Sequence, residues 1–154
     1  MTGKADFTPE EWEQVIGAPP AAGLLVATAQ RGGTFRESFS IAKAYTEARQ
    51  RHGESELLDQ IVSTKPELDV KRYGSPDELE RDVVDRIRQA VSLVGSKAGP
   101  EEAQSYRRFI VDLAERVAEA HKEGFMGLSG ERVSEAEREA IAKIEEAAGS
   151  ESNE

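Results

Sequence analysis

The amino-acid sequence predicts an all-α fold, a single-domain bundle of about seven helices. Apolar residues recur at spacings of three and four, and no run alternates long enough to indicate a strand. Helix-start signals, each combining a hydroxyl residue with a nearby glutamate, precede several of these segments. The chain has 154 residues and no long linker, so we expect one domain over 1–154 with frayed termini at 1–6 and 149–154.

The expected helices lie near residues 9–16, 20–30, 34–51, 54–63, 76–94, 100–123 and 134–148. The first begins at Thr8, whose hydroxyl can cap the helix while Pro9 takes the first helical position. Glu11 can reach back to the backbone of Thr8, and Phe7 can pack on Trp12. These local signals predict a well-defined helix start.

The second helix comes from the most apolar run of the chain, Ala18–Ala29, which opens close to two prolines. This run is too short to span a bilayer and lacks the basic start of a secretory signal. We therefore expect a buried helix and no membrane association. The third helix has Phe35, Phe39 and Tyr45 on one face, and the short fourth, at 54–63, has its own apolar stripe.

The next two helices are long and strongly amphipathic. Ser75 and Gly99 precede their first residues, and each is followed by a proline and acidic residues. The first stripe consists of Leu79, Val83, Ile87, Ala90 and Val94. The second consists of Ala103, Tyr106, Ile110, Leu113, Val117 and Ala120. The short connection at 95–99 predicts antiparallel packing of the two, and the last helix, 134–148, should fold back along 100–123.

Composition and charge exclude several classes of function. The formal net charge is −10, and acidic residues exceed basic ones most strongly in 1–16 and 131–154. This balance disfavours binding to nucleic acid or to anionic lipid. The chain has no cysteine, which excludes disulfides and thiolate metal sites and fits a cytoplasmic location. His52 and His121 each lie in the last turn of an expected helix, where a cation favours the exposed carbonyls. Neither has the spaced partners that hydrolase chemistry requires, so we expect no enzyme activity.

The glycine-rich stretch EGFMGLSGERVSEAE, residues 123–137, is the candidate site for a function. It lacks the lysine and hydroxyl ending of a phosphate-binding loop. Glu131, Glu135 and Glu137 gather near the start of the last helix, beside loop carbonyls and Ser134, which caps that helix. Such oxygen ligands suit a divalent cation such as calcium. Under the alternative interpretation these glutamates only complement the helix dipole.

The segment Asp112–Gly149 resembles the repeat of bacterial tellurite-resistance TerB-like domains. The resemblance is carried by Gly130-Glu131-Arg132-Val133-Ser134-Glu135-Ala136-Glu137, and residues 26–37 are a fainter echo. It implies an all-helical fold whose acidic residues bind cations and partner proteins in stress responses. Glu131 and Glu137 carry over by position, with Glu37 as a weaker counterpart, whereas Ser129 stands where the family has an aspartate. The chain also resembles short uncharacterised bacterial all-helical proteins.

The sequence therefore predicts a non-enzymatic acidic interaction protein, a stress-associated adaptor with a weak cation site near 131–137. The alternative is a small apolar-ligand binder in which Phe125, Met126 and Leu128 gate a cavity between helices. A protein partner is expected in the first case. A homodimer would form if the 20–30 helix, or the side bearing Tyr106 and Phe109, left an apolar face uncovered.

Overall fold

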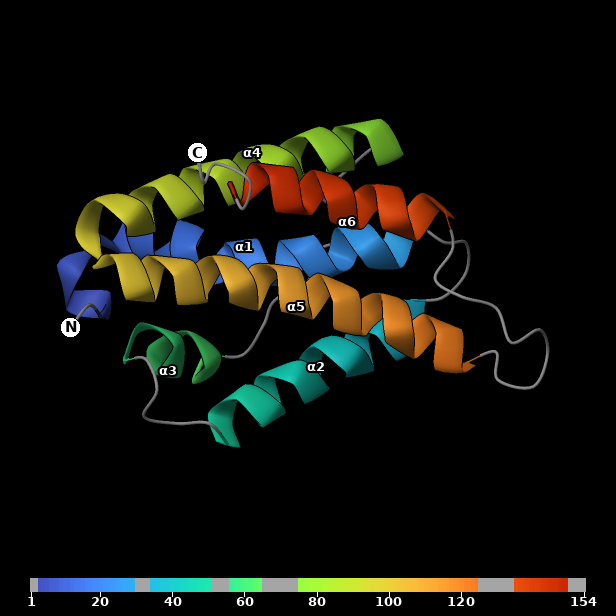
Figure 1. The fold of residues 1–154 in the computed structure, drawn as a ribbon, viewed down its shortest axis with the longest axis horizontal. Helices are drawn as coiled ribbons and strands as arrows, with labels where there is room; N and C mark the ends of the chain where they lie inside the picture. Colours follow the sequence, from blue (N-terminus) through green and yellow to red (C-terminus); the bar gives the residue numbers. More distant parts are fainter. Residues whose placement is uncertain (1–2, 30–33, 51–55, 65–74, 125–134, 150–154) are drawn as a thin grey trace.

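A central helix, α1 (Pro9–Ala29), contacts every other long helix of the bundle (Figure 1). The computed structural model describes residues 3–29, 34–50, 56–64, 75–124 and 135–149. The side chains of residues 27–40, 76 and 120–137 are not described. The other elements are η1 (Lys4–Asp6), α2 (Thr34–Gln50), α3 (Glu56–Val62), α4 (Pro76–Lys97), α5 (Pro100–Gly124) and α6 (Glu135–Ala147). In the described residues every regular element is helical, which confirms the predicted all-α class.

The helices α4, α5 and α6 each run antiparallel to the one before, as the sequence predicts. α4 and α5 form a hairpin, and α6 runs back along α5 while also touching α4 and α1 (Figure 1). α2 crosses the opposite side of α5, and the short α3 packs against both. The Nε of Arg49 donates to the carbonyl of Val62 over 2.7 Å, which ties the end of α2 to the end of α3.

The predicted break between helices 9–16 and 20–30 is wrong. Both segments belong to the continuous helix α1, with Pro19 and Pro20 in its interior. A proline has no backbone N–H, so the carbonyl four residues earlier loses its usual partner. For Pro19 that carbonyl belongs to Val15, and the hydroxyl of Tyr106 on α5 donates to it over 2.6 Å. A tertiary hydrogen bond thus replaces the missing helical one and supports α1 across the prolines.

The start of α1 has the predicted capping box. The backbone N–H of Glu11 donates to Thr8 Oγ1 over 3.1 Å, and the N–H of Thr8 donates to Glu11 Oε1 over 2.9 Å. The ring centroids of Phe7 and Trp12 lie 5.7 Å apart, which forms the expected hydrophobic staple. The backbone of Thr8, the Thr8 hydroxyl and Lys97 together stabilise the ionised carboxylate and lower the pKa of Glu11.

The structure describes residues 3–6 of the stretch 1–6 that we expect to fray. Lys4–Asp6 form a short 3-10 helix, and the N–H of Lys4 donates to Gln60 Oε1 over 2.6 Å. Lys97 donates to the carbonyl of Asp6 over 3.0 Å and lies 5.6 Å from the centre of the Phe7 ring. Contacts with α3 and α4 therefore hold this segment in place.

One hydrophobic core joins all six α-helices of the described residues. Its largest fully buried side chains are Tyr45, Tyr106, Ile41, Leu57, Ile61, Ile87, Ile110, Leu113 and Ile144. Phe109 is buried as well and meets Tyr45 edge to face, with ring centroids 5.6 Å apart. The described part of the 20–30 segment is equally buried, from Ala21 to Val26. The two faces considered for a homodimer are thus covered within one chain.

Candidate functional site

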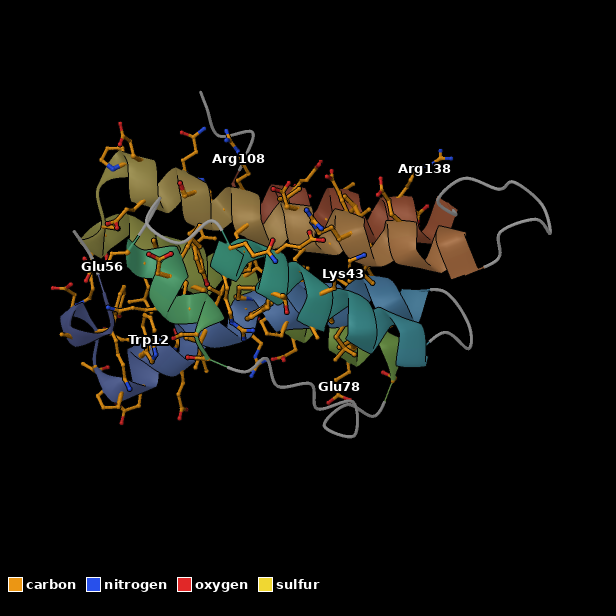
Figure 2. All side chains as sticks on the ribbon, turned by 90° about the horizontal axis from the view of Figure 1, so that it is seen from below. Trp12, Lys43, Glu56, Glu78, Arg108 and Arg138 are labelled. Carbon is orange, nitrogen blue, oxygen red and sulfur yellow. The ribbon has the colours of Figure 1, made fainter. Side chains whose placement is uncertain are left out.

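An open groove of about 560 Å³ lies between α5 and α6. Its lining residues are Glu115, Ala118, Glu119, Arg138, Ile141, Ala142 and Glu145. The apolar part consists of buried Ala118, half-buried Ile141 and exposed Ala142. In Figure 2, Arg138 points outward from α6, away from the core. The groove therefore faces solvent on the outside of the bundle and is not an enclosed cavity.

The helical repeat explains why these side chains share one groove. Ala118 and Glu119 lie three and four positions after Glu115 along α5, which places them on the same face as Glu115. The α6 residues that line the groove, from Arg138 to Glu145, recur in the same way. α5 and α6 run antiparallel and are in contact. The residues at the outer edges of their two apolar stripes therefore form the walls of the groove.

Carboxylates outnumber cations among the described residues that line the α5–α6 groove. Partial desolvation raises the pKa of Glu115, and the negative charges of Asp112, Glu145 and Glu119 raise it further. Each of these carboxylates thus makes it harder for Glu115 to ionise, because like charges repel at short range. Among the described residues that line this groove, Arg138 is the cation and three are glutamates. The arrangement favours a positively charged ligand, which would relieve this repulsion.

The raised pKa predicts how stability depends on pH. A carboxyl group whose pKa is higher in the folded than in the unfolded state destabilises the fold at pH values above its folded pKa. That destabilisation disappears as the pH falls through the folded and then the unfolded pKa. We therefore expect Glu115→Gln to raise the melting temperature at pH 7, and the gain to vanish near pH 4. Thermal unfolding of both proteins across this range measures it, and an equal gain at both pH values would contradict the prediction.

A second groove, between α4 and α6, has balanced charge and a volume of about 360 Å³. It is lined by Glu80, Arg81, Val84, Asp85, Arg88, Lys143 and Glu146. Lys143 forms an ion pair with Glu80 across the groove, and this hydrogen bond raises the pKa of Lys143. Acidic and basic groups alternate along its walls, so it favours neither sign of ligand.

The predicted cation site falls largely outside the described residues. Glu131 and Ser134 lie in the stretch 125–134, which the structure does not describe. Glu135 and Glu137 belong to the first turn of α6, but their side chains are not described. The convergence of these side chains on an ion therefore stays a prediction from the sequence. Among the residues that are described, no group of three or more acidic or histidine side chains could hold a metal ion.

The residues of the predicted ligand gate and the two histidines are likewise not tested by the structure. Phe125, Met126 and Leu128 lie outside the described residues, as does His52. His121 lies in α5, but its side chain is not described. The α5–α6 groove is not predicted from the sequence, because its walls come from two helices that are brought together only by the tertiary fold. One signal in the sequence could have indicated this groove. It is the acidic edge beside the apolar stripe of α5, formed by Asp112, Glu115 and Glu119.

Comparisons with protein-family models, curated proteins and solved structures found no match to the chain. The resemblance to TerB-like domains is therefore still a prediction from the sequence. In the described part of the chain, no helix combines the length and apolar character that crossing a membrane requires.

Proposed function

We propose that this protein is a non-enzymatic interaction module that binds a protein partner in the α5–α6 groove. The observation that carries this proposal is the composition of the groove: an apolar strip at Ala118, Ile141 and Ala142, with Glu115 and Glu119 on the α5 side and Glu145 and Arg138 on the α6 side. Exposed apolar surface with a polar rim is typical of a protein-binding site. The predicted stress-associated adaptor role and cytoplasmic location belong to the same proposal.

The shape of the groove favours a protein partner over a small apolar ligand. Sites for small apolar molecules are usually concave pockets that bury most of the ligand surface. The α5–α6 groove is open along its length and has glutamates on both helices. A partner side chain could cover Ile141 while its neighbours contact the carboxylates. The apolar-ligand alternative depends on Phe125, Met126 and Leu128, and nothing in the described residues favours it.

Site-specific photo-crosslinking tests the proposed interaction. A photoreactive amino acid replaces Ala142, which is exposed in the groove, and in a matched control it replaces Gln89, exposed on α4 outside both grooves. We expect a defined protein adduct from position 142 in the cell of origin and none of that mass from position 89. Mass spectrometry identifies the crosslinked protein. Equal adducts at both positions, or no adduct at 142, would contradict the proposal.

A further inference from the structure

The geometry points to an amphipathic helix as the occupant of the α5–α6 groove, one that carries lysines or arginines beside its apolar residues. This inference rests on the proposed function, because it names the chemistry of the partner at the same site. Two independent features of the groove carry it, namely the backbone chemistry of its walls and the spacing of its carboxylates.

The walls of the groove favour a helix over an extended segment. α5 and α6 are helical along the groove, so their backbone N–H and C=O groups are already paired within each helix. An extended occupant would bury its own backbone groups against walls that offer no backbone partner. A helix pairs these groups internally and presents only side chains. An antiparallel helix pair also provides the ridges and grooves into which a third helix packs.

The carboxylates have the spacing that a helical partner matches. Asp112, Glu115 and Glu119 stand at intervals of three and four along α5, a stripe roughly 10 Å long. Glu145 approaches from α6 and contributes to the same field. Lysines or arginines one turn apart on a partner helix would meet this stripe, and their methylene stems would cover the apolar strip.

The charges also disfavour a second copy of this chain as the occupant. Each copy has a net charge of −10, so two copies repel one another before they touch. The groove carboxylates Glu115, Glu119 and Glu145, with Asp112 beside them, add a local repulsion to this general one. A partner of opposite charge gains attraction instead, and it also removes the mutual repulsion that raises the pKa of Glu115.

A designed probe peptide tests this inference on the intact protein. The probe is a fluorescein-labelled peptide of about 15 residues, with leucines alternately three and four positions apart and lysines flanking them. Fluorescence anisotropy measures its dissociation constant at low and at physiological salt. We expect E115Q/E119Q to weaken binding by about three- to tenfold, since each pair at an exposed site contributes a modest amount. We expect R138Q to tighten binding by about twofold, because it removes a like charge from the groove.

A matched variant separates the groove from general attraction to an acidic protein. E10Q/E13Q removes the same charge from exposed positions of α1, outside the groove, and should change the dissociation constant less than twofold. A scrambled peptide of the same composition should bind more weakly, and one with glutamate in place of lysine should not bind. Far-ultraviolet circular dichroism should show the bound probe gaining helix. Melting temperatures of all variants check that each remains folded.

The outcomes distinguish this inference from the proposed function. Equal weakening by E115Q/E119Q and E10Q/E13Q, or binding without gain of helix, would overturn the helical occupant. A crosslinked partner at position 142 together with no binding of the probe would keep the interaction module and reject the basic amphipathic helix. Failure of both experiments would reject the function and the inference together.

Discussion

Replacing Tyr106 by phenylalanine should lower the free energy of unfolding by about 1–3 kcal/mol, although it removes a single oxygen atom. The Tyr106 hydroxyl donates to the carbonyl of Val15, and both residues are fully buried. Because Pro19 supplies no N–H, the carbonyl would lose the partner that replaces its helical hydrogen bond. Burial raises the pKa of Tyr106 well above its ordinary value, so the hydroxyl remains a donor throughout the neutral range.

The matched control is Tyr45, a second buried tyrosine in the same core. Its hydroxyl has no hydrogen-bond partner among the described residues, and burial raises its pKa as well. Tyr45→Phe removes a buried hydroxyl without breaking a hydrogen bond, so it should leave stability unchanged or increase it. Urea denaturation of the two variants measures the difference. Equal losses in both would contradict the assigned role of Tyr106.

A double-mutant cycle with Pro19→Ala tests why this hydrogen bond is needed. Alanine at position 19 restores a backbone N–H that can bond to the carbonyl of Val15. In that background Tyr106→Phe should be less destabilising, with a coupling energy of about 1 kcal/mol. A coupling near zero would mean that Tyr106 stabilises the core independently of the proline. Circular dichroism of the variants verifies that α1 remains helical in all of them.

The continuity of α1 shows where prediction from sequence ends. The cap at Thr8 and Glu11, the staple from Phe7 to Trp12 and the cap at Ser75 are formed by neighbours in the chain, so the sequence predicts them correctly. The prolines at 19 and 20 are also local, and they predict a break. That prediction is wrong because the compensating donor, Tyr106, comes from another helix. A local pattern does not show which helix will lie beside it.

The candidate site is likewise predictable from the sequence only in its local features. The apolar stripe of α5 is predicted by its period, and the sequence also predicts that the last helix folds back along α5. The acidic edge of α5 is visible in the sequence, but its neighbour Glu145 becomes part of the groove only when α6 folds back. The sequence instead predicts a site at Glu131, Glu135 and Glu137, because these residues cluster along the chain. Charge that accumulates in space is harder to predict than charge that accumulates in sequence.

Gly23→Val should lower the free energy of unfolding by about 1–3 kcal/mol through overpacking. Gly23 lies within α1, and a Cβ atom there would stand 2.8 Å from Ile41 Cδ1 and 2.9 Å from its Cγ1. Ile41 is itself fully buried on α2, so it has little room to move aside. The same Cβ would also approach Val117 on α5 at 3.4 Å. Because Gly23 has no side chain, α2 and α5 can approach α1 closely here. Thermal unfolding measures the loss of stability in the Gly23→Val variant.

Gly95→Ala is the matched control for the effect of glycine itself. Gly95 lies within α4, and a Cβ there would meet nothing within 4 Å. Alanine should stabilise this position by roughly 0.5–1 kcal/mol, because glycine loses more backbone freedom in a helix. Opposite signs at the two positions would separate the packing effect at Gly23 from helix propensity. Stabilisation by Gly23→Val would contradict the close approach of α2 to α1, because valine can then fit only if the two helices lie further apart.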